Sequence, residues 1–294
     1  MQNDSLVSVL MNCYNGEKYL RDSITSLLNQ SYKNWELIFW DNQSTDSSKT
    51  IFHSFKDKRL KYFYAPSHEV LYEARNQAMT KVNGDYIAFL DTDDFWKKSK
   101  LEKQISLFKN KEVGLVYSNI WKCYDFPFKF KKLHRKGKLP VGFIFNELAL
   151  DYSVALTAVI LRKEFLKDHP TIFNIKYNML ADYDFVLRFS KKYKFDCVQS
   201  PLAFYRIHKG NMSNRYLSEQ TIQLKKWLHT NLKENFFSTE NQIKIINNHL
   251  NYLELKDSIK KSGFFDSLNK IIKHSYFKEK IKLFIFLIFR KYIF

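Results

Sequence analysis

Three carboxylates gather in one short stretch of the sequence. Residues 86–90 (YIAFL) are apolar and read as a buried strand, and Asp91, Asp93 and Asp94 follow at once. Like charges packed so closely repel one another unless a cation neutralises them. Carboxylate oxygens suit Mg²⁺ or Mn²⁺, and Mg²⁺ commonly combines one or two carboxylates with substrate phosphates. The stretch predicts a metal–diphosphate site, although Asp93 or Asp94 could instead cap a helix near Ser99.

Polar residues also follow two other predicted strands. The apolar runs 6–11 and 35–40 end at Asn12 and Asp41, as residues 86–90 end at Asp91. In open α/β sheets, ligands bind beside the carboxyl ends of the strands. Asn and Asp also favour turns after strands for purely structural reasons, so both interpretations stay open.

The expected secondary structure that positions these residues alternates between strands and helices, as judged from the spacing of the apolar residues. Helical patterns and strand patterns follow one another through the first 120 residues, which predicts an α/β, Rossmann-like, mostly parallel sheet with helices on both faces. The expected helices cover residues 17–29, 44–55 (capped by Ser44 or Thr45), 70–82 and 101–108, and further strands cover 60–64 and 113–119.

The second half of the chain changes character. Strands are expected at 154–161 and 195–205, a helix at 179–193, and only helices from about residue 216. We therefore expect a catalytic domain at 1–214 and a helical extension at 215–294. Residues 276–294 are apolar with flanking Lys and Arg, which is typical of a helix lying in a membrane interface. A helix docked on the catalytic domain is the alternative.

Composition narrows the class of protein. The 294 residues are 45% hydrophobic and 17% aromatic, which favours a folded chain over a disordered one. A net charge of +18 indicates an anionic partner, which could be a nucleic acid, a membrane surface or a phosphorylated small molecule. The basic, aromatic stretch 122–138 could meet nucleic acid, but such stretches are more often solvated loops. Neither a signal peptide nor a membrane-spanning segment is expected.

Several other classes need motifs that the chain lacks. Phe95 stands two positions beyond Asp93, where phosphatases of the haloacid dehalogenase type have Thr or Val. Neither a GxxxxGK[ST] loop nor a GxGxxG loop occurs, which disfavours P-loop enzymes and the usual dinucleotide oxidoreductases. The three cysteines form no zinc pattern, and a reduced compartment without disulfides is expected.

Four ordered motifs resemble glycosyltransferase family 2. They are SVLMNCYNG at 8–16, DNQSTD at 41–46, ARN at 74–76 and GDYIAFLDTDD at 84–94. The likeness continues through DYD at 182–184 and YRIH at 205–208, so it covers about residues 5–214. The resemblance implies a GT-A fold, a nucleotide-diphosphate sugar donor, a divalent metal and inversion at the anomeric carbon.

The resemblance also implies a role for each matching residue. Tyr14 would lie along the nucleoside, Asp41 would accept the uracil N–H, Arg75 would face the diphosphate and Asp91 would meet the ribose. Asp93 would hold Mg²⁺ or Mn²⁺, and His208 would face that metal or the departing diphosphate. The other expected nucleotide-sugar contacts are Asn12, Asn15 and Arg206, the last adding positive charge.

Asp182 is the expected catalytic base. Inverting transfer needs a carboxylate that takes the proton of the acceptor hydroxyl. Asp182 lies near the start of a predicted helix, where the helix dipole favours a charged carboxylate, whereas Asp184 can pair with Arg188 four residues on. Ala181 departs from the family, which usually has Glu there, so a supporting carboxylate is missing. Asn12 stands where Pro is frequent, and Asn42–Gln43 where Asp-Gly is frequent.

The sequence therefore predicts a metal-dependent inverting glycosyltransferase. It would move a hexose or N-acetylhexosamine from a UDP-sugar to a hydroxyl of a glycan, with the acceptor expected to be lipid-linked, in surface-glycan or glycoprotein-glycan assembly. The tail and charge suggest a peripheral enzyme on the cytoplasmic side of the inner membrane. A sugar nucleotidyltransferase is the alternative, but its usual Gly-rich basic loop is absent after the first strand. A nucleic-acid-binding protein would leave the acidic cluster without a purpose.

Overall fold

The computed structural model describes residues 5–125, 129–167, 171–274 and 277–293. The chain divides into two compact units. The first contains residues up to 123 together with 131–206, and the second contains 124–130 and the residues from 207 onward. Each unit is described by itself.

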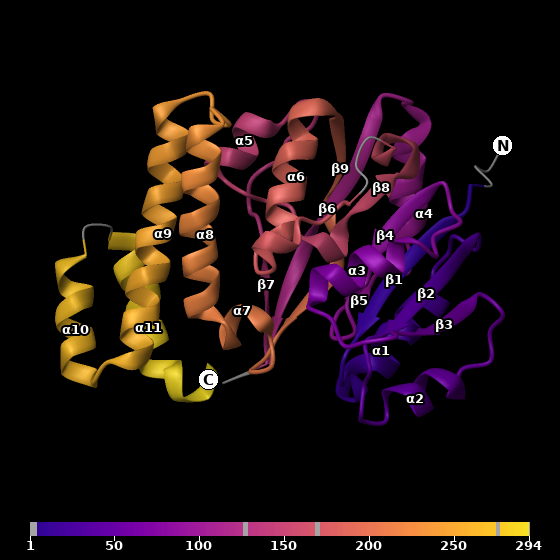
Figure 1. The fold of residues 1–294 in the computed structure, drawn as a ribbon, viewed down its shortest axis with the longest axis horizontal. Helices are drawn as coiled ribbons and strands as arrows, with labels where there is room; N and C mark the ends of the chain where they lie inside the picture. The colour runs from indigo at the N-terminus through magenta and orange to yellow at the C-terminus, as the bar shows by residue number, and fades with distance from the viewer. Residues whose placement is uncertain (1–4, 126–128, 168–170, 275–276, 294) are drawn as a thin grey trace. The chain divides into compact units, whose positions relative to one another are not determined.

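The first half of unit 1 is a parallel sheet, as the alternating pattern predicted (Figure 1). Strands β3, β2, β1 and β4 lie in that order, with each neighbouring pair parallel. They are β1 (Val7–Cys13), β2 (Trp35–Asp41), β3 (Leu60–Tyr64) and β4 (Tyr86–Phe89). The helices between and after them are α1 (Glu17–Leu28), α2 (Ser48–Ser54), α3 (Leu71–Met79) and α4 (Lys100–Ile105).

The sheet continues beyond β4 with antiparallel neighbours, so it is mixed rather than mostly parallel. β8 pairs antiparallel with β4 and β6, and β5 pairs antiparallel with β9. The strands are β5 (Phe95–Trp96), β6 (Val113–Tyr124), β7 (Phe130–Leu133), β8 (Ile160–Arg162) and β9 (Lys194–Ile207). The helices here are α5 (Phe145–Leu150) and α6 (Ala181–Lys192), with 3-10 turns at Ser106–Lys109, Leu156–Ala158, Lys163–Leu166 and Ile175–Tyr177.

Two expected elements were wrong in part. The helix expected at 44–55 begins only at Ser48, because Ser44 and Thr45 bond the loop after β1 instead of capping it. The strand expected at 154–161 is a 3-10 turn followed by the short β8. Neither Asp93 nor Asp94 lies next to α4, whose N-cap residue is Ser99.

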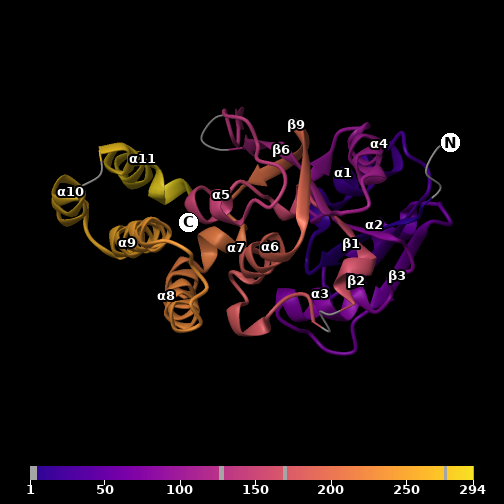
Figure 2. The same cartoon turned by 90° about the horizontal axis from the view of Figure 1, so that it is seen from above.

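Helices lie on both faces of the parallel strands, with α1 and α4 on one side and α3 on the other (Figure 2). Alternate residues of a strand point to opposite faces. Val9 of β1 and Leu37 of β2 accordingly join the core under α1 and α4, where Leu20 and Leu101 are fully buried. Both faces are covered, which explains why these strands are apolar runs rather than alternating ones.

Gly84 lets β4 lie against β1. A Cβ at this position would come within 2.4 Å of the Leu6 carbonyl oxygen and 2.8 Å of the Ser8 backbone nitrogen. The Gly84 N–H donates instead to Ser8 Oγ at 2.8 Å. A side chain at position 84 would therefore displace β4, the strand that leads into the turn containing Asp91, Asp93 and Asp94, which we call the acidic turn.

Unit 2 is largely helical. The capping box of Thr239 and Gln242 begins α9, because each residue's side chain accepts from the backbone N–H of the other. The helices are α7 (Met212–Arg215), α8 (Leu217–Lys233), α9 (Glu240–Lys261), α10 (Phe264–Lys273) and α11 (Phe277–Ile293). The expectation of helices only from residue 216 is confirmed for the described residues, and none of these helices is long and apolar enough to cross a bilayer.

Glu36 joins three segments at the amino end of the sheet. It is buried in β2, accepts hydrogen bonds from Ser8 Oγ at 2.6 Å and Asn83 N at 3.0 Å, and pairs with Lys61. Burial raises its pKa, but the bonds from Lys61, Ser8 and Asn83 outweigh burial and hold the pKa below its ordinary 4.5.

We expect Glu36→Gln to destabilise unit 1 by about 2 kcal/mol at pH 7, the size typical of hydrogen bonds to a buried charge. The carboxylate stays ionised to lower pH in the fold than in the unfolded chain. Its contribution is therefore present above pH 4.5 and is lost as the pH falls below that value. Urea unfolding at several pH values measures this. Glu112→Gln, which breaks an exposed pair with Lys194, is the control and should cost less than about 0.5 kcal/mol.

Candidate active site

The ends of β1, β2 and β4 meet at one edge of the sheet. Cys13 pairs with Asp41 in the parallel register, and the Leu90 N–H donates to the Leu10 carbonyl. The segments that follow these strands therefore begin side by side. This edge is where the sequence predicted the donor site.

Arg75 and Asp91 form the centre of the site. The Arg75 side chain, from α3, is only 4% exposed, and its Nη2 pairs with Asp91 Oδ1. Its guanidinium also lies over the Tyr72 ring, 4.8 Å from the centroid. Burial raises the pKa of Asp91, and Asp93 adds to this, while Arg75 acts in the opposite direction. Arg75 is thus a buried cation at the rim of the sheet, and not part of a helix-surface pair.

The two remaining carboxylates of the turn differ in exposure. Asp94 is fully buried, and its Oδ1 accepts from the Arg206 N–H at 3.0 Å. Burial, together with the charges of Asp93 and Asp91, raises the pKa of Asp94 well above its usual range. Asp93 remains half-buried. Asp94 therefore shapes the turn, and Asp91 and Asp93 are the members that can meet a ligand.

Arg206 anchors the same turn from β9. Its Nε donates to the Asp93 carbonyl at 2.9 Å, and its Nη2 pairs with Asp22 at 2.9 Å. The guanidinium lies between the rings of Tyr19 and Phe95, at 4.6 and 4.9 Å from their centroids. These contacts make Arg206 a positioning residue for the turn. A direct contribution of its charge to diphosphate binding stays a prediction.

Asp182 reaches the same centre from α6. The helix covers Ala181–Lys192, slightly inside the expected 179–193, and Asp182 Oδ1 accepts from the Tyr183 N–H at 2.9 Å. Burial raises the pKa of Tyr72 well above its usual range, and the charge of Asp182 and a hydrogen bond to it add to that effect. Burial and then Asp182 act likewise on Tyr152, and Asp182 also raises the pKa of Asp91. The carboxylate is therefore an electrostatic neighbour of the Arg75–Asp91 pair.

Asp184 takes the structural part expected of it. It is buried and pairs with Arg188 Nε at 2.9 Å, so the predicted i,i+4 ion pair is confirmed. Of the two carboxylates in the first turn of α6, Asp182 is the one that influences the acidic turn.

Tyr14 and His68 form an aromatic pair at the end of β1. Tyr14 is 54% exposed, and its ring centroid lies 4.2 Å from that of His68. His68 Nδ1 is 2.9 Å from the Asn42 carbonyl oxygen, which fixes the pair to the loop after β2. An exposed aromatic surface of this kind suits a nucleobase.

Asp41 is fully buried. Its Oδ1 accepts from the Ser44 N–H at 2.7 Å, and its Oδ2 accepts from the Tyr62 hydroxyl at 2.5 Å. Both oxygens thus have protein partners in this arrangement. The predicted contact with uracil stays a prediction.

The two predicted asparagines differ in their surroundings. Asn15, at a φ of 53°, ties the first loop to the second, because its Oδ1 accepts from the Thr45 N–H at 2.8 Å. Asn12 Nδ2 is buried without a hydrogen-bond partner among the described residues. Its predicted contact with the nucleotide-sugar stays a prediction.

His208 belongs to unit 2. Its Nδ1 accepts from the Gly210 backbone N–H at 3.0 Å, and the His208 backbone N–H donates to Asn211 Oδ1 at 2.6 Å. The ring is held by the turn that follows it. Its predicted role toward a metal or diphosphate stays a prediction.

The acidic turn fits a divalent metal that completes its shell with substrate. The described residues contain no cluster of three or more His, Cys, Asp or Glu able to enclose an ion. The mutual repulsion within the turn nevertheless raises the pKa values of Asp91 and Asp94, in addition to burial. One or two carboxylates plus phosphate oxygens are a usual set for Mg²⁺. The role of Asp93 as that protein ligand stays a prediction.

Sequence reasoning missed Tyr72 and His68. Tyr72 lies three positions before Arg75, so the two share a helix face, and that spacing could have indicated it. His68 had no such signal, because its position depends on the loop after β2.

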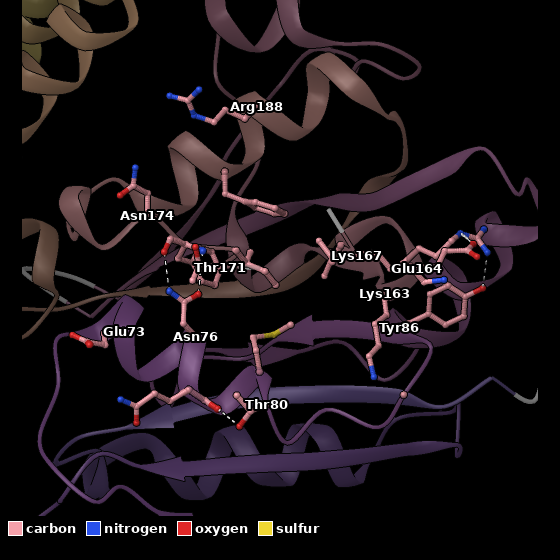
Figure 3. A pocket seen from close by; sticks show the side chains of 18 of the residues that line it. Glu73, Asn76, Thr80, Tyr86, Lys163, Glu164, Lys167, Thr171, Asn174 and Arg188 are labelled. Carbon is pink, nitrogen blue, oxygen red and sulfur yellow. Dashed lines mark hydrogen bonds and ion pairs between the residues drawn. The ribbon is translucent and has the colours of Figure 1, made fainter. Parts of the chain in front are cut away.

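A large hollow lies elsewhere on unit 1, with a volume of about 1380 Å³ (Figure 3). It is lined by residues 83–86, which precede and begin β4, and by Asn76, Thr80 and Arg188. Asn76 is bonded in both directions to the Phe173 backbone, at 2.8 and 3.1 Å. Because it reaches the amino end of β4, we do not assign this hollow to the donor.

Comparison with known proteins finds relatives that are named as glycosyltransferases. An uncharacterized glycosyltransferase of Haemophilus influenzae is 44% identical over 123 residues, which cover 41% of this chain and 49% of the relative. The chain thus spans about half the length of that relative. The UDP-Glc:alpha-D-GlcNAc-diphosphoundecaprenol beta-1,3-glucosyltransferase WfgD of Escherichia coli is 29% identical over 218 residues, covering 74% of this chain and 83% of the relative.

A solved structure and the family model complete the comparison. Residues 1–349 of Staphylococcus aureus TarS, in complex with UDP-GlcNAc, superpose with a TM-score of 0.67 at 18% identity, covering 90% of this chain and 79% of that one. This confirms the GT-A fold with its helical extension. The model of glycosyl transferase family 2 matches residues 8–169, which include the acidic turn and Arg75. Because that match covers more than half of the sequence, the chain belongs to glycosyl transferase family 2.

Proposed function

We propose that this chain is an inverting glycosyltransferase that moves a hexose or N-acetylhexosamine from a UDP-sugar to a hydroxyl of a glycan. The observation that carries the proposal is the meeting of the Asp91–Arg75 pair, Asp93 and Asp182 at the carboxyl edge of the sheet. These residues come from three different segments. In this proposal residues 1–214 are the catalytic domain and 215–294 the helical extension.

The proposed chemistry divides between the base and the leaving group. Asp182 takes the proton of the acceptor hydroxyl while the acceptor oxygen bonds to the anomeric carbon. The bond from that carbon to the diphosphate oxygen breaks, UDP departs, and the configuration inverts. Arg75 holds Asp91 and directs positive charge toward the diphosphate. A Mg²⁺ or Mn²⁺ held by Asp93, and in the prediction also by His208, would neutralise charge on the leaving group.

The acceptor is proposed to be a lipid-linked glycan. The support is the relative from Escherichia coli, whose name includes a diphosphoundecaprenol-linked sugar as acceptor. A lipid-linked acceptor places the enzyme at a membrane surface, which we propose is the cytoplasmic side of the inner membrane, in the assembly of a bacterial surface glycan or a glycoprotein glycan.

A thermal-shift screen of nucleotide-sugars tests the donor. Ligands that bind only the folded chain raise its melting temperature. With Mn²⁺ present, UDP-glucose or UDP-N-acetylglucosamine should raise it by about 5 °C at a hundredfold excess over Kd, and GDP-mannose by much less. A nucleotidyltransferase would instead respond to a nucleoside triphosphate with a sugar 1-phosphate, and that result would replace the proposal.

A further inference from the structure

Helix α11 is apolar on two opposite sides. Leu283, Phe286 and Leu287 are at most 5% exposed and pack with Ile259 and Ile271 within unit 2. The other side carries a second set of apolar side chains, which we call the outer stripe. Its members are between 43% and 51% exposed: Ile281, Phe284, Ile285 and Ile288.

The outer stripe has the spacing of one helix face. Its members stand at i, i+3, i+4 and i+7, which places them within an arc of roughly 100°. The inner side packs against buried residues of α9 and α10, the two helices that lie beside α11 (Figure 1). The outer stripe is not part of the buried cluster of unit 2, so α11 presents a second apolar side that this cluster does not bury.

Charge around the stripe is strongly positive. Residues 264–294 contain seven Lys and Arg against two acidic residues. Both acidic residues are already engaged, Asp266 with Lys270 at 2.7 Å and Glu279 with His274 at 2.5 Å. Lys282 is exposed beside the stripe. An anionic ligand at this surface would therefore meet lysines that have few acidic neighbours.

These observations favour a lipid surface over a second copy of the chain. A twofold dimer brings the same patch of both copies together, so it would set these lysines against one another. An anionic bilayer offers phosphate headgroups to the lysines and acyl chains to the stripe. With 17 residues, α11 is too short and too charged to span the bilayer, so it must lie along the surface.

We propose that the outer stripe of α11 binds anionic membrane surfaces, with α11 parallel to the bilayer. The proposal deepens the proposed function, because it explains how the enzyme reaches a lipid-linked acceptor. It differs from an unanchored tail, since the inner side keeps α11 packed on unit 2 while the stripe meets lipid.

Vesicle flotation of the full chain tests this surface. Wild-type protein should bind vesicles containing 30% phosphatidylglycerol at least about tenfold more tightly than pure phosphatidylcholine vesicles, and high salt should weaken the binding. The double variant Ile281→Ser/Ile285→Ser should lose at least about tenfold in affinity for the anionic vesicles. The matched control is Ile222→Ser/Leu232→Ser on α8, which removes two exposed apolar side chains and should bind as wild type.

Three results would overturn the proposal. An equal loss of vesicle affinity in the control variant would mean that any exposed apolar residue contributes to membrane binding. Unchanged vesicle binding by the stripe variant would mean that the stripe does not contact lipid. A wild-type dimer that the stripe variant abolishes, with vesicle binding retained, would assign the stripe to a second copy. Melting temperatures of both variants exclude misfolding. Lys273→Gln/Lys282→Gln, which leaves the stripe intact, should still weaken binding to anionic vesicles.

The outcome is separable from that of the proposed function. Nucleotide-sugar binding in solution needs no membrane, so it should be the same in wild type and stripe variant. Absence of UDP-sugar binding would overturn the glycosyltransferase proposal while leaving the vesicle result valid.

Discussion

Asp182→Asn should bind UDP about as tightly as wild type and transfer sugar about a thousandfold more slowly. The amide keeps the size of the side chain but cannot take the acceptor proton, and a positioned base typically contributes a hundredfold to ten-thousandfold. Asp182 pairs with no phosphate in the proposal, so donor binding should change less than about twofold. Calorimetry with UDP and Mn²⁺, together with a UDP-release assay, measures the two effects separately.

Asp184→Asn is the matched control for this result. It lies two positions away in the same helical turn and pairs with Arg188. Because that carboxylate is buried, the variant should lower the melting temperature yet retain turnover per folded molecule. Comparable loss of UDP affinity in Asp182→Asn, or turnover near that of wild type, would remove Asp182 from the role of base.

Asp93→Asn should abolish transfer and also remove the metal-dependent part of UDP binding. Asp93 is the half-buried carboxylate of the acidic turn, and an amide is a far weaker ligand for a hard cation. UDP affinity of the wild type should rise on adding Mn²⁺ and fall with excess EDTA, whereas affinity of the variant should respond to neither. Titrating UDP with and without Mn²⁺ compares the two proteins.

Asp85→Asn provides the control at the other end of the same strand. Asp85 is exposed and precedes β4, while the acidic turn follows it. The control should keep both the metal response and the activity. Turnover by the wild type in excess EDTA would exclude a divalent metal from the reaction.

The parallel half of the fold was predictable because its pattern is local. Residues 35–40 and 86–90 are short apolar runs that end in a polar residue, and helical patterns separate them. Such runs need both faces covered, which leads directly to a parallel sheet. We expected Asp41 and Asp91 at the carboxyl edge of the sheet. The register of the parallel strands puts both of them there.

The antiparallel half and the fine structure of the site were not predictable in this way. β8 has only three residues, and its place between β4 and β6 depends on partners far along the chain. The pairing of Arg75 with Asp91 likewise joins a helix to a loop. Composition and periodicity carry no information on such contacts. The resemblance to the family assigned Arg75 to the diphosphate and Asp91 to the ribose, and it did not predict that the two side chains pair with each other.

The contacts of Arg206 bear on how the protein is made. Its N–H and Nε fix Asp94 and Asp93, which lie 112 and 113 positions earlier in the chain. On the ribosome, Asp93 and Asp94 are therefore synthesised more than a hundred residues before the arginine that fixes their turn. The family match ends at residue 169, so the most recognisable part of the sequence lacks the arginine that completes that turn. A chain that ended before residue 206 would lack both hydrogen bonds that Arg206 makes to this turn.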